Sequence, residues 1–232
     1  MNPQDRLIVA LDVAEPSQAF ELTSQLAGVA TWVKVGSVLF SLAGRKLVRD
    51  LVDDGWNVFL DLKLHDVPHQ VSMTVDALGD LGVKLATLHT SGGPRMMEAA
   101  AKSAASASKE GLKLLGVTVL TSMDEDELRS VGVARTPAET VALRARLAQQ
   151  SGLDGVVSSA LEARAIRDIV GPEFEIVTPG IRPQGVQSHD QKRVATPRQA
   201  FEAGASRIVV GRAITQADDP AAAAASILAN LQ

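Results

Sequence analysis

The chain has 232 residues, 46% of them hydrophobic and only 3% aromatic, which suits one large domain or two small ones with an aliphatic core. The absence of cysteine excludes disulfides, thiolate metal sites and cysteine nucleophiles, and a net charge of −4 argues against a nucleic-acid-binding surface. No apolar run approaches the roughly 20 residues of a membrane span, and the chain does not start with the basic and apolar segments of a signal peptide, so we expect a cytoplasmic protein.

Eight short apolar runs alternate along the chain with longer segments of mixed polarity. The runs are continuously apolar rather than alternating, which is typical of strands buried on both faces of a parallel sheet. We therefore predict strands over eight segments, namely 6–12, 32–36, 56–63, 84–89, 112–120, 154–159, 174–180 and 206–211.

The segments between these runs show helical spacing of apolar residues, and prolines lie near several of their expected first turns. Glycines follow several of them, as expected at helix ends. The predicted helices are 16–28, 68–82, 93–108, 136–150, 159–170 and 197–203, and the alanine-rich stretch 221–225 also reads as helix. No linker divides the chain, so we expect one domain over residues 1–232. Eight strands alternating with helices favour a closed (β/α)8 barrel, with an open doubly wound sheet as the alternative.

Polar residues gather at one end of the predicted strands. They lie at or just past the C-terminal end of a strand, which is the rim where barrels build their active sites. A requirement for stability alone would scatter polar residues over both rims. The residues concerned are Asp12, Lys34, Asp61, Lys63, His89, Thr121, Ser158 and Arg212.

A charged motif follows the third predicted strand. Asp61 and Lys63 are two residues apart on an extended chain and so share a face. Lys34 ends the second strand among apolar residues, where an unpaired charge would be costly, and Asp66 follows at the turn. Two lysines and two aspartates are neutral together, and the carboxylates favour the ammonium form of Lys63, which suits a proton donor better than a Schiff-base amine. A structural ion-pair network is the alternative.

A second group of residues suggests a phosphate site. Gly211 and Arg212 directly follow the eighth predicted strand, and barrels often bind phosphate after strands 7 and 8. Arg212 has the forked guanidinium that suits a phosphate. Arg182 follows the seventh strand and opens a long loop, 180–193, which we expect to close over a ligand. A surface arginine without a ligand is the alternative for Arg212.

With these motifs the sequence resembles the orotidine 5'-phosphate decarboxylase family over the whole chain. The matching segments are LIVALD (7–12), WVKVG (32–36), DLKLHDVP (61–68), LHTSGG (88–93), VTVLTS (117–122), VTPGIRP (177–183) and IVVGRAIT (208–215). The resemblance implies decarboxylation of orotidine 5'-monophosphate to uridine 5'-monophosphate, the last step of de novo pyrimidine nucleotide synthesis, without metal or cofactor. It also implies that CO2 leaves directly, assisted by the charges of the site, and that C6 is then protonated.

The resemblance also implies a role for each matching residue. Lys34, Asp61, Lys63 and Asp66 correspond to the catalytic array of the family, in which Asp66 acts in the active site of the other subunit of a homodimer. The substrate-binding residues that it implies are Asp12 for the ribose, Lys34, Thr121 near the pyrimidine, and Arg182, Gln191, Gly211 and Arg212 around the phosphate, with Gln191 also reaching the base. The chain departs from many relatives at His69 and Gln70, where Asn and Thr are common, and this affects the expected contacts between subunits.

Two other functions remain as alternatives. A metal-dependent phosphosugar decarboxylase or aldolase shares the D-x-K-x-x-D motif but places an acidic ligand near the end of the second strand. This chain has Lys34 there, and a lysine repels Mg²⁺, which needs oxygen ligands. A non-catalytic nucleotide-binding barrel has the same fold, but binding alone does not need four alternating charges beside an apolar pocket.

Overall fold

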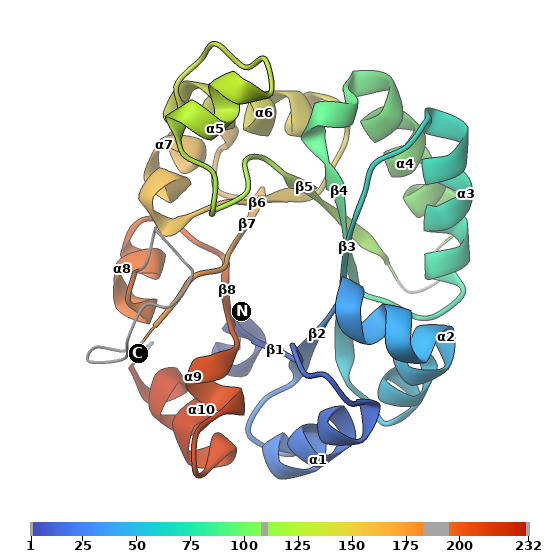
Figure 1. The fold of residues 1–232 in the computed structure, drawn as a ribbon, viewed down its shortest axis with the longest axis vertical. Coiled ribbons are helices and arrows are strands. Elements are labelled where there is room, and N and C mark those ends of the chain that lie inside the picture. The colour runs from blue at the N-terminus through green and yellow to red at the C-terminus, as the bar shows by residue number, and fades with distance from the viewer. Residues whose placement is uncertain (1, 108–110, 183–194, 231–232) are drawn as a thin grey trace.

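The eight apolar runs form the parallel strands of a closed barrel in which neighbours in sequence are neighbours in space, and β8 pairs with β1. A computed structural model describes residues 2–107, 111–182 and 195–230, and Figure 1 shows the strands encircled by helices. The (β/α)8 barrel is therefore confirmed, and the open sheet is wrong. The strands are β1 (Leu7–Ala10), β2 (Trp32–Gly36), β3 (Asn57–Leu64), β4 (Leu85–His89), β5 (Lys113–Val117), β6 (Gly155–Val157), β7 (Glu175–Thr178) and β8 (Arg207–Val210).

All the predicted helices form. Proline takes the first position of most of them, where its missing N–H costs nothing, and glycine in the left-handed region follows several, as Gly28 (φ 79°) does after α1. The helices are α1 (Pro16–Leu26), α2 (Ser37–Asp53), α3 (Pro68–Gly79), α4 (Pro94–Ala107), α5 (Glu125–Ser130), α6 (Pro137–Gln150), α7 (Ala160–Val170), α8 (Pro197–Glu202), α9 (Arg212–Thr215) and α10 (Pro220–Ala229), with 3-10 turns at Pro3–Arg6 and Thr90–Gly92.

Helix α2 was not predicted from the sequence. Gly44 lies inside it with a non-helical backbone (φ 62°, ψ −154°), so the helix kinks there. The kink interrupts the helical spacing on which the prediction depends. The short helices α5 and α9 were also missed, because four to six residues are too few for a periodic pattern.

Apolar side chains fill both the barrel and the layer between strands and helices. The inner cluster includes Ile8, Phe59 and Leu115, whereas a larger cluster packs the helices onto the outside of the sheet. At the N-terminal end of the barrel, Glu175 forms ion pairs with Arg207 (3.2 Å) and Lys113 (2.8 Å). These ion pairs stabilise the end of the barrel opposite the C-terminal ends of the strands.

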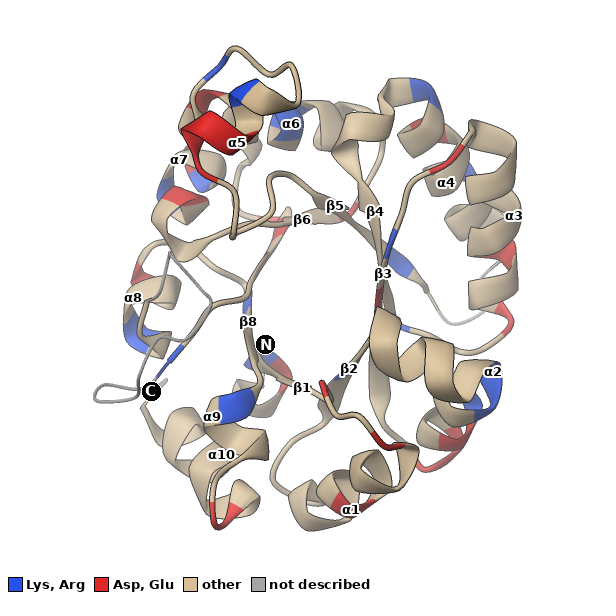
Figure 2. Ribbon diagram, in the orientation of Figure 1, with Lys and Arg blue, Asp and Glu red and all other residues tan. Residues whose placement is uncertain are grey.

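In the ranges that the structure describes, no helix combines the length and the apolar character needed to cross a membrane. Charged residues lie on the outer helices and also at the inner rim near β1, β2 and β3, as Figure 2 shows. The expected cytoplasmic location stays a prediction.

Candidate active site

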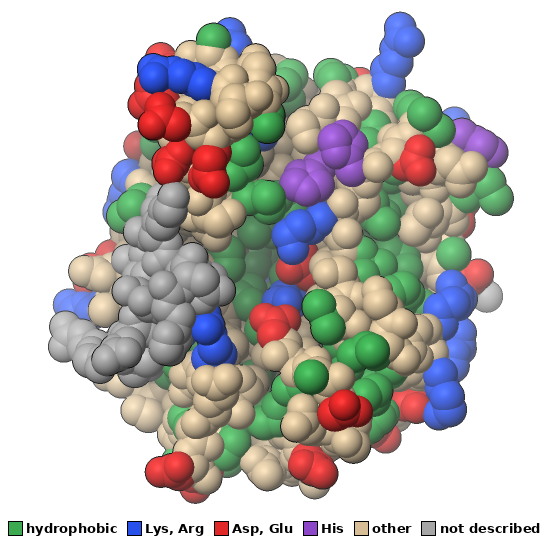
Figure 3. Space-filling view, in the orientation of Figure 1, with side chains coloured by type: hydrophobic (Ala, Val, Ile, Leu, Met, Phe, Trp, Pro, Cys, Tyr) green, Lys and Arg blue, Asp and Glu red, His purple; other side chains and the backbone are tan. Residues whose placement is uncertain are grey.

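The C-terminal ends of the strands surround a cavity of about 680 Å³, which is within the usual size range of small-molecule sites. Figure 3 shows the hollow at the centre of this face, with basic and acidic side chains on its wall. The cavity brings together eight of the residues singled out in the sequence, which are Asp12, Lys34, Asp61, Lys63, Thr121, Arg182, Gly211 and Arg212.

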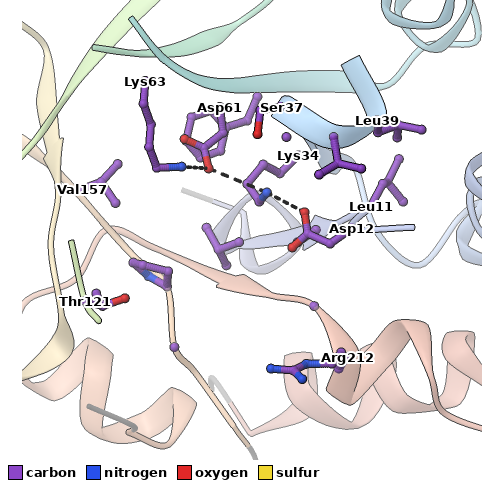
Figure 4. A pocket seen from close by; sticks show the side chains of 18 of the residues that line it. Leu11, Asp12, Lys34, Ser37, Leu39, Asp61, Lys63, Thr121, Val157 and Arg212 are labelled. Atoms are coloured by element: carbon purple, nitrogen blue, oxygen red, sulfur yellow. Dashed lines mark hydrogen bonds and ion pairs between the residues drawn. The ribbon is translucent and has the colours of Figure 1, made fainter. Parts of the chain in front are cut away.

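Four of these side chains form a row of alternating charge along one wall (Figure 4). The Nζ atom of Lys34 lies 2.8 Å from Oδ1 of Asp12 and 3.7 Å from Oδ2 of Asp61. The same Oδ2 atom of Asp61 lies 2.9 Å from Nζ of Lys63. Lys34 is 8% exposed, so its charge depends on these carboxylates rather than on water.

Asp61 is the centre of this row. Burial alone would raise its pKa, but the ammonium groups of Lys34 and Lys63 and the hydrogen bonds from Lys63 and Thr87 outweigh burial. The pKa of Asp61 therefore lies below its ordinary value, and the carboxylate is ionised at neutral pH. A fixed negative charge then stands beside Lys63, whose side chain is 37% exposed and reaches toward the cavity.

Thr87 was missed by the sequence analysis. It lies on β4, is 1% exposed, and donates a hydrogen bond to Oδ1 of Asp61 (2.9 Å) while accepting one from the backbone N–H of Lys63 (2.9 Å). A polar residue in the middle of the apolar run LATLH was the available signal, because a buried hydroxyl needs hydrogen-bond partners.

Across the cavity from Asp61 and Lys63 lie Thr121 and Arg212, as Figure 4 shows. Thr121 belongs to the segment between β5 and α5, and Arg144 of α6 donates a hydrogen bond to the carbonyl oxygen of Thr118 (2.5 Å) in that segment. Arg212 begins α9 directly after Gly211. The hydroxyl and the guanidinium thus face the charged row over the space that a ligand would fill.

Arg182 also lines the cavity, and its backbone N–H donates a hydrogen bond to the carbonyl oxygen of Ala195 (3.0 Å). The residue is 7% exposed, and its Nε atom has no hydrogen-bond partner in the described part of the chain. A buried guanidinium donor without a partner is costly, so this atom is a candidate for binding an anion.

Other predicted residues lie outside the cavity. Asp66 is exposed, and its Oδ1 accepts a hydrogen bond from the N–H of Val67 (2.6 Å). His89 is the last residue of β4 and Ser158 directly follows β6, in agreement with the prediction, but neither lines the cavity. Gln191 and most of the predicted closing loop 180–193 fall outside the described residues.

No metal-binding group is apparent among the described residues, since no set of three or more histidine, aspartate or glutamate side chains is placed to hold an ion. The carboxylates in the cavity bind ammonium groups instead, at 2.8 and 2.9 Å. The chemistry that these residues offer is therefore electrostatic stabilisation and proton donation by an ammonium group held beside a carboxylate.

Comparisons with known proteins identify the family of the chain. The sequence profile of the orotidine 5'-phosphate decarboxylase / HUMPS family matches residues 5–227. Orotidine 5'-phosphate decarboxylase of Hydrogenovibrio crunogenus is 46% identical over 231 residues, covering 100% of this chain and 98% of that protein, and the enzyme of Pseudoalteromonas translucida is 45% identical over 222 residues, covering 96% and 95%. A crystal structure of orotidine 5'-phosphate decarboxylase from Lactobacillus acidophilus superposes with a TM-score of 0.88 at 39% identity, covering 97% of this chain and 98% of that one.

Proposed function

Because the chain belongs to the orotidine 5'-phosphate decarboxylase / HUMPS family, we propose that it converts orotidine 5'-monophosphate to uridine 5'-monophosphate, a carboxy-lyase reaction of pyrimidine nucleotide synthesis. The observation that carries this proposal is the row of alternating charge, Asp12–Lys34–Asp61–Lys63, on the wall of a cavity that suits a nucleotide. Neither a metal nor an organic cofactor takes part.

The nucleotide spans the cavity, with its phosphate at Arg182 and Arg212 and its pyrimidine ring at Lys63. Its phosphate binds Arg182 and Arg212 beside Gly211, and the buried Nε of Arg182, which has no partner in the described chain, supports this assignment. Asp12 accepts hydrogen bonds from the ribose hydroxyls, and Thr121 contacts the pyrimidine. The resemblance adds Gln191, on the predicted closing loop, to the phosphate contacts. Binding energy from the phosphate then helps to fix the distant ring at the reacting end.

The bond between C6 and the carboxylate carbon breaks with its electron pair left on C6, in the plane of the ring. The π system cannot accept that pair, so the barrier falls through nearby charge. The ammonium group of Lys63 stabilises the carbanion and donates a proton to C6, and Lys63 regains a proton from water. Asp61 stands beside the departing carboxylate, and loss of CO2 relieves the repulsion between them. Lys34 holds Asp61 ionised and oriented.

A homodimer completes the site, with Asp66 contributed to the cavity of the other subunit. Within one chain Asp66 is exposed and lies outside the cavity, which supports this assignment. Large apolar side chains on α2, on α3 and in the turn before α3 are also exposed, as expected for a surface covered by a second subunit. These are Val38 (64%), Leu42 (57%), Val67 (60%) and Met73 (55%).

Mixing two inactive variants tests the shared site. In hybrids of Asp66→Ala and Lys63→Ala subunits, one of the two sites has both residues intact if Asp66 acts across the interface, so part of the activity returns. If Asp66 acts within its own chain, both sites stay defective, and the absence of recovery refutes the shared site.

Turnover by Lys63→Ala tests the catalytic assignment. General acid catalysis contributes about 10²–10⁴-fold and an oriented charge about 10²–10³-fold, so kcat should fall by at least about 10⁴-fold. Binding of uridine 5'-monophosphate, measured by calorimetry, should remain measurable because the phosphate contacts are intact. Lys46→Ala, which removes an exposed lysine on α2, is the control. Turnover of Lys63→Ala near the wild-type rate would remove Lys63 from the mechanism.

Treatment with EDTA separates this proposal from a metal-dependent phosphosugar enzyme. Lys34 lies on β2, two residues before the strand ends, and binds two carboxylates, so we expect orotidine 5'-monophosphate decarboxylation to be unchanged after chelation. Loss of the activity on chelation, with recovery on adding Mg²⁺, would favour the metal-dependent alternative. Wild-type protein that binds the nucleotide without consuming it would favour a binding barrel.

A further inference from the structure

The pairing between β3 and β4 is irregular at the reacting end of the site. The register runs regularly to Leu60, opposite Ala86, and resumes at Leu64, opposite Leu88. Three residues of β3 therefore face a single residue of β4, which is Thr87. Such a bulge leaves backbone groups without their ladder partners and re-aims side chains.

The Thr87 side chain takes the place of the missing ladder partner. Its hydroxyl lies 2.9 Å from the backbone nitrogen of Lys63 and 2.9 Å from Oδ1 of Asp61. A backbone N–H can only donate, so the hydroxyl accepts from Lys63 and its own hydrogen points to the carboxylate. This direction matches an ionised Asp61, which only accepts.

Lys63 also has an unusual backbone. Among the described residues it is the one non-glycine residue with a positive φ (53°), a conformation that L-residues adopt rarely. Residues in such conformations persist where their surroundings hold them and are concentrated at functional sites. The hydrogen bond from the Lys63 N–H to Thr87 is one of the contacts that hold it, and it lies inside the protein because Thr87 is 1% exposed.

These contacts close a ring. Thr87 binds Oδ1 of Asp61, Oδ2 of Asp61 binds Nζ of Lys63 at 2.9 Å, and the backbone of Lys63 returns to Thr87. We propose that Thr87 is a positioning residue of the decarboxylation: through one hydroxyl it fixes both the orientation of the Asp61 carboxylate and the backbone from which the Lys63 side chain reaches the substrate. The proposal rests on the proposed function and adds a residue that does not touch the substrate.

The test replaces Thr87 by valine, which has nearly the same shape but no hydroxyl, and by serine, which keeps the hydroxyl. A hydrogen bond to a charged group corresponds to roughly 10- to 100-fold in rate, so kcat of Thr87→Val should fall by about that factor. KM should change by less than about 3-fold, because the phosphate and ribose contacts are remote from Thr87. Thr87→Ser should recover most of kcat.

A second readout follows Asp61 itself and needs no catalysis. The Thr87 hydrogen bond is one of the interactions that lower the pKa of Asp61, so the pKa should rise in Thr87→Val and return in Thr87→Ser. Carboxyl-carbon NMR measures this in the protein without substrate. The acidic limb of kcat should move to higher pH in the same variant, because the reaction needs ionised Asp61.

Thr90→Val is the matched control, since Thr90 is 2% exposed and its hydroxyl donates to the carbonyl oxygen of Val117 (2.9 Å) without touching Asp61 or Lys63. It should lose stability but keep kcat and the pKa of Asp61. If Thr87→Val does not fold, Thr87→Ala is judged by the same two readouts.

If the wild type is active and the Thr87 variant has the same kcat and the same Asp61 pKa as the wild type, the positioning role of Thr87 is refuted. The proposed function is not affected by that result. Equal losses of kcat in Thr87→Val and Thr90→Val also refute the positioning role, because the effect would then be general. A wild type that does not decarboxylate the nucleotide refutes the proposed function instead, and the NMR result still decides whether Thr87 orients Asp61.

Discussion

Replacing Lys34 by methionine removes the cation that links two carboxylates in the cavity. Its Nζ atom lies 2.8 Å from Asp12 and 3.7 Å from Asp61, and its side chain is 10% exposed. Methionine fills a similar volume, so the change removes charge with little loss of packing. The Asp12 side chain is 61% exposed and can return to water, whereas that of Asp61 is 14% exposed and cannot.

Removing one partner of a buried ion pair typically costs about 3–5 kcal/mol of the free energy of unfolding. Asp61 keeps Lys63 at 2.9 Å as a second partner, so we expect the lower end, about 3 kcal/mol. In a chain of this length each kcal/mol lowers Tm by about 2–4 °C, which gives a decrease of roughly 6–12 °C.

The assay is thermal unfolding of the ligand-free protein, followed by circular dichroism at neutral and acidic pH. In the folded wild type the pKa of Asp61 is lowered, so the ionised carboxylate stabilises the fold. This stabilisation is complete above the unfolded pKa of about 3.9 and is lost as the pH falls through the lower folded pKa. Without Lys34 the folded pKa rises. The difference in Tm between variant and wild type should therefore be largest at neutral pH and narrow as the pH falls through the raised pKa of the variant toward the lowered pKa of the wild type.

Lys46→Met is the control, because Lys46 forms an ion pair with Asp50 (2.6 Å) but its side chain is 84% exposed. Such a surface pair contributes no more than about 0.5 kcal/mol. A Lys34 variant whose Tm matches that of the Lys46 variant, or whose deficit does not depend on pH, would refute the view that the row of charges is buried and coupled.

Three further substitutions test the rest of the structure. In Gly36→Ala the new Cβ would lie 3.2 Å from Nζ of Lys34, so kcat/KM for orotidine 5'-monophosphate should fall by about 10-fold in a steady-state assay. An unchanged value would contradict the close approach. In Gly155→Ala the Cβ would lie 2.4 Å from the backbone oxygen of Glu175, which cannot move aside. Urea unfolding should therefore show that the free energy of unfolding falls by at least about 3 kcal/mol. A wild-type unfolding midpoint would contradict this expectation. Glu175→Ala leaves the buried guanidinium of Arg207 without its carboxylate, so the free energy of unfolding should fall by about 3–5 kcal/mol in the same measurement. A loss below about 1 kcal/mol would show that this ion pair at the N-terminal end of the barrel contributes little.

The strands were easier to predict than the helices, for a physical reason. A parallel strand buried on both faces must be continuously apolar, and each predicted run coincides with one observed strand, although β3 extends one residue beyond its run, to Leu64. The ends were less certain, because apolar residues continue beyond the ladder. The run 112–120, for example, contains β5, which stops at Val117, while Val119 is buried in the cavity wall outside any strand.

The residues of the site were predictable where their position on the strand dictates where they point. Asp61 and Lys63 lie two residues apart near the C-terminal end of β3, and Lys34 lies two residues before the end of the neighbouring strand β2, so a barrel brings them to one rim. The bulge in β3, the positive φ of Lys63 and the hydroxyl of Thr87 depend on pairing between strands, which a single run of sequence does not reveal. The roles of these residues, and of Asp66 and Gln191, stay predictions.

A crystal structure of the complex with uridine 5'-monophosphate would show whether Lys63 lies at the reacting carbon. We expect C6 of the pyrimidine to lie about 3–3.5 Å from Nζ of Lys63, with the Asp61 carboxylate beside Lys63 and the phosphate against Arg182 and Arg212. A nucleotide bound with C6 turned away from Lys63, or with its phosphate at the charged row, would contradict this expectation.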